Sequence, residues 1–177
     1  MRAHTLIELM MGLIISALML CVAVPLFQGP IADARFHAFG AELTGNLVMA
    51  RRYAQISHRP VWLEFSDDPR CYYRCWVERE TGDMELISEH IRDTKSPIDL
   101  RLFEEPLPHP TQGSMIGKPL SSTHGERIHF THVGSSAVTL TYTDGLSRAY
   151  CAVISPNSGR IRAFLWEPSQ KSWLPFF

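Results

Sequence analysis

The first thirty residues carry the strongest hydrophobic pattern in the chain. Residues 9–27 are consecutive positions without a charge. As a helix they extend about 28 Å, which matches the roughly 30 Å hydrocarbon core of a bilayer. No clear small-x-small cleavage site follows the run, so we interpret it as a retained membrane-spanning helix rather than a secretory signal peptide. Arg2 is the nearest positive charge, and it predicts a cytoplasmic N-terminus with the remainder of the chain outside.

A second helical pattern occupies residues 31–58. Its apolar residues recur at steps of three and four, as on an amphipathic helix that packs on a sheet. They are Phe36, Phe39, Leu43, Leu47, Ala50 and Ala54. Gly40 and Gly45 each cost about 1 kcal/mol relative to alanine, which predicts a weak middle for this helix. Pro60 and the residue before it end the helix.

Beyond Pro60 the pattern changes to short runs rich in β-branched and aromatic residues. We expect strands at residues 61–65, 73–79, 84–91, 98–103, 128–133, 137–142, 148–154 and 160–166. Turn residues at 81–83, 144–145 and 157–159 join successive strands as antiparallel hairpins. A stretch rich in Pro, Gly, Ser and Thr, residues 105–126, predicts a long surface loop. The expected fold class is therefore α+β, a long N-terminal transmembrane helix packed on a small antiparallel β-sheet head at 60–177.

Composition limits the functions that the whole chain can have. The formal net charge of −1 and the pI of about 6.7 exclude a generally basic nucleic-acid binder and an acidic disordered tail. Charge is nevertheless divided along the chain. Residues 61–110 hold twelve acidic side chains against six basic ones, whereas residues 127–177 hold five basic side chains against Asp144 and Glu167. A function that depends on positive charge must therefore be local.

Glu8 is the unusual residue of the apolar run. A carboxylate there costs a few kcal/mol in a bilayer unless it lies at the interface or finds a partner. The segment 2–8, Arg-Ala-His-Thr-Leu-Ile-Glu, followed by the apolar run and Pro25, resembles the class III signal and N-terminal helix of type IV pilins and type II secretion pseudopilins. That family prefers Gly before the cleaved bond and an apolar residue after it, where this chain has Ala3 and His4.

The resemblance implies how the chain would be processed and assembled. Prepilin peptidase would cut between Ala3 and His4, removing residues 1–3 as a leader and leaving residues 4–30 as a transmembrane and assembly helix. Glu8 would neutralise the new amino terminus of a neighbouring subunit. Pro25 falls where the family kinks or locally melts this helix, as its missing N–H also predicts.

The rest of the chain resembles the GspH/FimT subfamily. The likeness lies in residues 50–54 leading into 59–63, and in the succession 128–130, Gly134, 138–142, 151–156 and 159–162. It implies a minor pilin of a type IV pilus, single-pass in a bacterial inner membrane, with residues 31–177 as a periplasmic head. Its partners would be other pilins and the prepilin peptidase. The alternatives are the equivalent subunit of a type II secretion pseudopilus and a single-pass anchored binding domain that never polymerises.

Arg160 and Arg162 are the candidate binding residues. In a strand, residues two apart share a face, which places their Cα atoms about 6.6 Å apart. Gly159 lets the backbone approach a partner closely, and Arg148 and Lys171 would widen the cationic patch. In FimT-type minor pilins a Gly-Arg-x-Arg turn is tied to DNA uptake, which implies non-specific contact with double-stranded DNA. The alternative is that the two arginines only solvate a terminal hairpin.

The cysteines of the head predict structural chemistry. In an oxidising compartment they are candidates for a disulfide. A Cys71–Cys75 bridge is the pairing we favour, although it requires a turn because an extended strand would hold the two Cα atoms about 13 Å apart. The competing pairing joins Cys71 or Cys75 to Cys151.

Other chemistry finds little support in the sequence. His129 and His132 would lie on opposite faces of a strand, and His109 and His124 fall in the expected loop, so we predict no metal site and no cofactor. No nucleophile, base and acid stand in a catalytic spacing, so the chain is not expected to be an enzyme. The aromatic residues near the C-terminus would cover the core or a neighbouring subunit, or stack on bases; they are Trp166, Trp173, Phe176 and Phe177.

Overall fold

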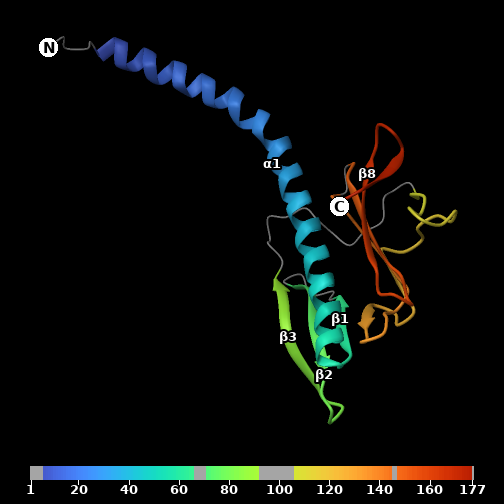
Figure 1. Ribbon diagram of the computed structural model, residues 1–177. Coiled ribbons are helices and arrows are strands. Elements are labelled where there is room, and N and C mark those ends of the chain that lie inside the picture. Colours follow the sequence, from blue (N-terminus) through green and yellow to red (C-terminus); the bar gives the residue numbers. More distant parts are fainter. Residues whose placement is uncertain (1–5, 66–70, 92–105, 145–146, 177) are drawn as a thin grey trace. The chain divides into compact units, whose positions relative to one another are not determined.

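One continuous helix dominates the N-terminal third of the chain. The computed structural model describes residues 6–65, 71–91, 106–144 and 147–176 (Figure 1). It divides into two compact units, Met1–Phe39 and Gly40–Phe177. Helix α1, Leu6–Ser57, runs through both of them, so the expected helices at 4–30 and 31–58 are a single helix. The backbone is helical at Pro25; one missing N–H is tolerated because neighbouring turns of a long helix remain bonded.

The first unit contains the apolar end of α1. The 18-residue window Leu6–Ala23 has no buried residue and is long and apolar enough to cross a membrane. Glu8 lies in the first turn of the helix, where a carboxylate is favoured by the helix dipole. Ala3 and His4, the residues at the expected cleavage point, lie outside the described residues.

The second unit is built on two antiparallel sheets. The first, sheet A, has the order β3-β2-β1-β5. Its strands are β1 Val61–Phe65, β2 Cys71–Glu78, β3 Met84–Ile91 and β5 Arg127–Phe130. The second, sheet B, has the order β4-β6-β7-β8-β9. Its strands are β4 Leu120–Ser122, β6 Val138–Thr143, β7 Ala149–Ile154, β8 Ile161–Glu167 and β9 Ser172–Pro175. The α+β class is confirmed, but the expected single small sheet is wrong, because the head has two larger ones.

The second half of α1 contacts both sheets (Figure 1). Asn46 donates a 2.5 Å hydrogen bond to the Tyr73 hydroxyl of sheet A, and the Thr44 hydroxyl bonds that of Tyr150 in sheet B. The apolar stripe predicted from the sequence supplies the buried face between these contacts; its members in this unit are Leu43, Leu47, Ala50 and Ala54. The helix is therefore packed on two sheets rather than on one.

Gly40 is required by this packing. A Cβ atom at Gly40 would lie 2.7 Å from the Tyr142 hydroxyl and 3.1 Å from Cδ2 of Tyr150. The two tyrosine rings stack on each other with centroids 4.7 Å apart, so they cannot easily move aside. The glycine that predicted a weak helix therefore marks a close helix–sheet contact.

Sheet B is buried on both of its faces along β7, whose six residues are all buried. The face away from α1 is covered by part of the segment expected to be a surface loop, through Leu107 and Ile116. These two side chains pack on Ala149, Cys151 and Val153. The expectation of a surface loop at 105–126 is thus wrong in part, since this segment contains two core residues and strand β4.

The remaining strand predictions agree closely with the structure. Six of the observed strands begin within one residue of the expected positions; they are β1, β3, β5, β6, β7 and β8. Strands β4 and β9 were not predicted, because three or four residues carry too little periodicity. The expected strand at 98–103 lies outside the described residues.

A pair of substitutions tests the helix packing. Leu47→Ala should lower the free energy of unfolding of the head by about 2–5 kcal/mol, because Leu47 is fully buried and its removal leaves a cavity. Met49→Ala, at a side chain that is 65% exposed, should change it by less than about 0.5 kcal/mol. Denaturant titration of the full chain in detergent, followed by tryptophan fluorescence, measures both, since all four tryptophans lie beyond residue 60. Equal effects of the two substitutions would contradict the packing.

Candidate nucleic-acid interface

The turn between β7 and β8 holds the candidate arginines. The Gly159 N–H donates to the Ser155 carbonyl at 2.8 Å, and the Ser155 N–H donates to the Arg160 carbonyl at 3.0 Å. Gly159 has a φ of 61°, in the left-handed region that suits glycine. Strand β8 then begins at Ile161, so Arg160 precedes the strand and Arg162 lies within it. The sequence prediction of a hairpin turn at 157–159 is confirmed.

The Arg51 side chain, which comes from α1, binds the backbone of this turn. Its Nη2 donates a 2.6 Å hydrogen bond to the Ser158 carbonyl. Its Nε would lie only 2.9 Å from a Cβ atom at Gly159. Glycine is therefore needed at 159 for two reasons, the backbone angle and the space that Arg51 occupies. Sequence reasoning did not assign a role to Arg51, although it lies in the segment 50–54 on which the GspH/FimT resemblance partly rests.

The β5–β6 connection also forms hydrogen bonds to this turn. The Ser135 N–H donates to the Pro156 carbonyl at 2.9 Å, and the Ser135 hydroxyl donates to the Ser155 carbonyl at 3.2 Å. Residues from α1, from the β5–β6 connection and from the hairpin itself thus meet at residues 155–159. Such cross-bracing holds the backbone that carries Arg160 and Arg162 in one conformation.

Arg160 and Arg162 are exposed and, among the described residues, neither guanidinium forms an ion pair. The arginines of sheet A differ, because carboxylates neutralise them. The ion pairs there are Arg127–Glu64 at 2.6 Å, Arg74–Glu89 at 2.8 Å and Arg79–Glu85 at 3.0 Å. The excess of basic side chains near the C-terminus therefore survives folding as a local positive surface.

Arg148 and Lys171 do not join this surface. In the β7–β8 register Val153 is opposite Arg162, whereas Arg148 lies just before the other end of β7. Five residues separate positions 148 and 153, which corresponds to about 17 Å along a strand. Lys171 lies at that same far end, in the turn from β8 to β9. The expectation that these two residues widen the patch is wrong, because an antiparallel hairpin places its two ends far apart.

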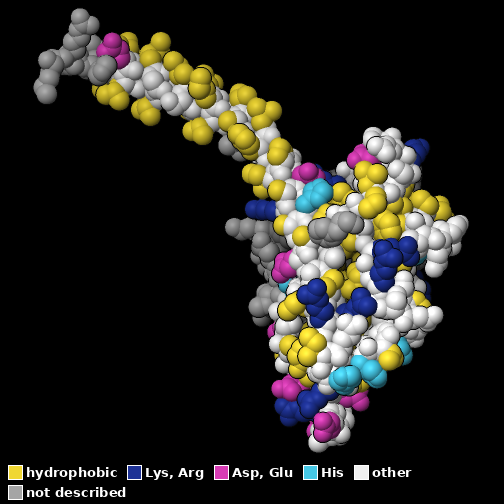
Figure 2. Space-filling model, viewed as in Figure 1, with side chains coloured by type: hydrophobic (Ala, Val, Ile, Leu, Met, Phe, Trp, Pro, Cys, Tyr) yellow, Lys and Arg dark blue, Asp and Glu magenta, His cyan; other side chains and the backbone are white. Residues whose placement is uncertain are grey.

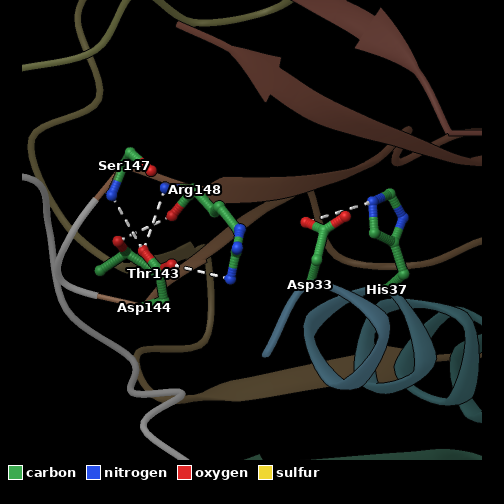
Figure 3. A network of polar contacts seen from close by, with 6 residues as sticks. All are labelled: Asp33, His37, Thr143, Asp144, Ser147 and Arg148. Carbon is green, nitrogen blue, oxygen red and sulfur yellow. Dashed lines mark hydrogen bonds and ion pairs between the residues drawn. The ribbon is translucent and has the colours of Figure 1, made fainter. Parts of the chain in front are cut away.

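Arg148 also has a local partner (Figure 3). Its Nη1 lies 3.4 Å from the Asp144 carboxylate, and that carboxylate accepts the backbone N–H groups of Ser147 and Arg148 at 3.1 and 3.0 Å. The Thr143 hydroxyl donates to the Arg148 carbonyl at 2.8 Å. The Asp144 carboxylate therefore links the two ends of the β6–β7 connection, and the Arg148 guanidinium is its ion-pair partner. Figure 3 also draws the Asp33–His37 pair of the first unit, at 4.0 Å on successive turns of α1.

The distribution of charge is visible on one face of the molecule (Figure 2). In this view Lys and Arg side chains lie over the middle of the β-rich part and also at its lower end, where Asp and Glu side chains lie beside them. This distribution agrees with the pairing pattern, in which the carboxylates of sheet A neutralise their own arginines. A polyanion would meet little repulsion on the middle of this face.

The cysteines of the head do not form the favoured bridge. Strand β2 is continuous from Cys71 to Glu78, so no turn brings Cys71 and Cys75 together. Cys75 and Cys151 are free thiols, which also excludes the pairings of either with another cysteine. Burial raises the pKa of the Cys75 thiol to about 11 and that of Cys151 to about 12. Both thiols are protonated at neutral pH and behave as small core side chains.

Histidine and tryptophan form a cluster on sheet A that the sequence did not reveal. The rings of Trp62 and His129 stack with centroids 3.9 Å apart, and His124 meets His129 edge-on at 5.3 Å. Burial, reinforced by the nearby His124, lowers the pKa of His129, so its imidazole is neutral at pH 7. Within the described part of the chain, no group of three His, Cys, Asp or Glu side chains is arranged to hold a metal ion.

The C-terminal aromatic residues cover a core. Phe164, Trp166 and Trp173 are partly buried against the cluster of Leu107 and Ile116. The indole N–H of Trp173 donates to the Pro108 carbonyl at 2.6 Å. Of the uses considered from the sequence, core coverage is the one that these contacts support.

Comparison with known proteins gives no independent assignment, because no protein-family model matches the chain and no curated protein or solved structure is detectably similar. The architecture itself, an apolar N-terminal helix followed by antiparallel sheets, is compatible with a pilin-like fold.

The double requirement for Gly159 can be tested by a mutant cycle. Gly159→Ala should lower the free energy of unfolding by about 2–3 kcal/mol, because a left-handed alanine costs about 1–2 kcal/mol and its Cβ clashes with Arg51. Adding Arg51→Ala should recover the steric part and leave about 1–2 kcal/mol. Gly117→Ala serves as the control, since a Cβ there would meet nothing within 4 Å. Additive effects of the Arg51 and Gly159 substitutions would contradict the contact.

Proposed function

We propose that this protein is a minor pilin of a type IV pilus that contacts DNA through the turn at 157–162. Its apolar helix serves first as a single-pass anchor in the bacterial inner membrane and later as the part that packs inside the fibre. The head then stands on the periplasmic side. The exposed apolar window Leu6–Ala23, joined to one compact head of antiparallel sheets, is the observation that supports assembly.

The physical argument for assembly starts from exposed apolar surface. No residue of the window Leu6–Ala23 is buried in the isolated chain, which is tolerable only in lipid or against other apolar helices. A carboxylate at Glu8 sits at the start of this surface. Its cost in an apolar setting favours a partner of opposite charge, and the resemblance to pilins names the amino terminus of a neighbouring subunit as that partner.

The head adds support for the GspH/FimT resemblance. The segments that carry the likeness include strand β1, strand β5 and the successive strands β6, β7 and β8. Arg51 comes from the same likeness and holds the Gly-Arg-x-Arg turn. The resemblance therefore rests on residues that are structurally connected in this head.

The argument for DNA contact starts from the positive surface at residues 157–162, where the described residues place no counter-charge. Arg160 and Arg162 project from a braced turn, and backbone phosphate is the partner that two exposed guanidinium groups recognise without regard to sequence. Two phosphates neutralised per subunit give a salt slope of about −2, which is weak for one head. Many heads along a fibre, or several contacts in one head, would strengthen it.

Processing and assembly provide the first test. Protein isolated from assembled fibres should lack residues 1–3, as measured by intact mass, and Glu8→Gln should remain in the membrane but fail to enter fibres. Ser16→Ala is a matched control on the same apolar helix, because the Ser16 hydroxyl bonds only its own helix, at the Gly12 carbonyl. Assembled protein that retains residues 1–3 would refute the proposal. Assembly in a secretion pseudopilus instead of a pilus would support the alternative machine.

DNA retardation provides the second test. The Arg160→Gln/Arg162→Gln variant of the full chain in detergent should lose essentially all binding to a short duplex, while its tryptophan fluorescence stays that of the folded head. Arg52→Gln/Arg127→Gln removes the same charge elsewhere and should keep the affinity within about twofold, because screening limits long-range effects to about 8 Å. Equal losses in both variants would mean that net charge, rather than the turn, binds DNA.

A further inference from the structure

An apolar groove lies beside the second half of α1, where the helix faces sheet A. Its volume is about 440 Å³, within the range of natural binding pockets. Met49, Tyr53 and Ile56 form its rim on the helix, and their steps of four and three place them on one side of α1. Buried side chains of α1 and sheet A form its floor, namely Ala50, Leu63 and Cys75. Helix α1 thus has a second apolar stripe beside the one that is buried in the head.

This second stripe is exposed. Met49 is 65% exposed, Tyr53 42% and Ile56 82%. On the opposite rim of the groove, Ile87 of β3 is 42% exposed. Large apolar side chains that gather around one groove mark an interaction surface, whereas scattered ones need no explanation. The groove therefore presents an apolar surface that the described residues of the head leave uncovered.

The strand on the opposite rim is the outermost strand of sheet A. In the order β3-β2-β1-β5, β3 has a neighbour on one side, and Figure 1 shows it at the edge of the sheet beside α1. Among the described residues, no strand pairs with the outer side of residues 84–89. An irregularity in the pairing with β2 lets the consecutive residues Ile87 and Ser88 both line the groove. Backbone N–H and C=O groups that can pair with a further strand therefore lie next to the apolar wall.

Arg52 is the charged member of the groove lining. Its side chain is exposed and, within the described residues, forms no ion pair. The carboxylates of β3 already have cationic partners, Glu85 with Arg79 at 3.0 Å and Glu89 with Arg74 at 2.8 Å. A carboxylate that enters the groove would therefore meet a guanidinium group available for a charge-assisted hydrogen bond.

The strand edge and the charge together select the kind of occupant. A lipid chain or an apolar helix could cover the apolar wall, but neither offers backbone groups to β3, because a lipid has none and a helix bonds its own. An extended polypeptide pairs its backbone with a strand edge and turns every second side chain to the same face. Of these occupants, only the extended polypeptide uses both the groove and the strand edge beside it.

We propose that the groove between α1 and β3 docks an extended segment of a partner protein, with apolar side chains at alternate positions and one carboxylate directed at Arg52. Pairing with β3 supplies affinity, and the groove and Arg52 supply selectivity. The site goes beyond the proposed assembly and DNA contact, because it uses neither the window Leu6–Ala23 nor the turn at 157–162. Failure of either of those functions would leave it standing.

Synthetic peptides test the site on the full chain in lipid nanodiscs, where no detergent micelle can fill the groove. The first labelled peptide has valine at alternate positions, threonine between them and one aspartate. The second has lysine in place of aspartate, and the third keeps aspartate but is N-methylated along its whole backbone. Fluorescence anisotropy should show saturable binding of the first and about tenfold weaker binding of the second, which loses the charge-assisted bond. The third should not bind, because its backbone cannot donate to β3.

Variants of the chain assign the binding to the groove. Arg52→Glu should reverse the preference, so that the lysine peptide binds about tenfold more tightly than the aspartate peptide. Arg160→Glu makes the same change of charge at the arginine turn and should keep the wild-type preference, because salt screens distant charges. Ile56→Ser should weaken both peptides about tenfold, because it removes part of the apolar wall. Val133→Ser is its matched control, a 71% exposed valine in the β5–β6 connection, and should change the affinity less than about twofold.

The opposite results would overturn the proposal. Equal binding of the N-methylated peptide would mean that apolar contact alone fills the groove. An unchanged preference in Arg52→Glu, or no saturable binding by the wild-type chain, would refute the site. A photo-reactive side chain in place of Tyr53 identifies the occupant by mass spectrometry, and a cross-link to the aspartate peptide is expected. A cross-link to another segment of the same chain, which the peptide does not displace, would show that the chain itself closes the groove and would refute docking.

Discussion

Burial of one face of α1 between two sheets is the constraint on which the head depends. Leu43, Leu47 and Ala54 are almost completely buried on that face. Hydrogen bonds to Tyr73 on one sheet and Tyr150 on the other hold the helix in register with both. Because the two sheets meet the same helix, a change at this face would alter the positions of both sheets. The placement of the arginine turn is one such consequence, since Arg51 on this helix binds the Ser158 carbonyl.

Ion pairing, more than composition, determines where unpaired positive charge remains on the head. The carboxylates of sheet A bind the arginines of their own sheet, so these arginines leave no unpaired positive charge there. Sheet B has few carboxylates, and Asp144 is used in a turn with Arg148. Among the described residues, Arg160 and Arg162 therefore form a small positive surface at one end of the β7–β8 hairpin. A small surface of this kind suits weak, sequence-independent contact that is repeated along a fibre better than tight binding by one molecule.

The two halves of α1 have hydrophobic patterns that suit different environments. Its first half is apolar around its circumference and exposed, which suits lipid or neighbouring helices. Its second half has one apolar face and carries polar residues on the other, which suits a soluble head. Both halves belong to a single helix, Leu6–Ser57. A helix of this kind suits the proposed passage of the subunit from membrane to polymer.

Periodic and local features could be read directly from the sequence. The apolar run, the stripe of α1, the strands β1, β3 and β8 and the turn at Gly159 all depend on neighbouring residues, so short windows contain the necessary information. The close approach at Gly40 could not be read in the same way, since only the tyrosines of sheet B explain that glycine. The short strands β4 and β9 were also missed, because their pairing with longer strands creates them.

The sequence alone therefore determined the elements and the pair of arginines, and tertiary structure decided which residues act with them. Arg51 and Ser158 lie 107 positions apart, so no local pattern connects them. Arg148 and Lys171 look close to the arginine pair in sequence but lie at the other end of the hairpin. Cys71 and Cys75 remain apart because their segment became a strand instead of a turn. The physical reason is the same in each case: periodicity is a property of adjacent residues, but contact between distant residues depends on how helices and sheets pack.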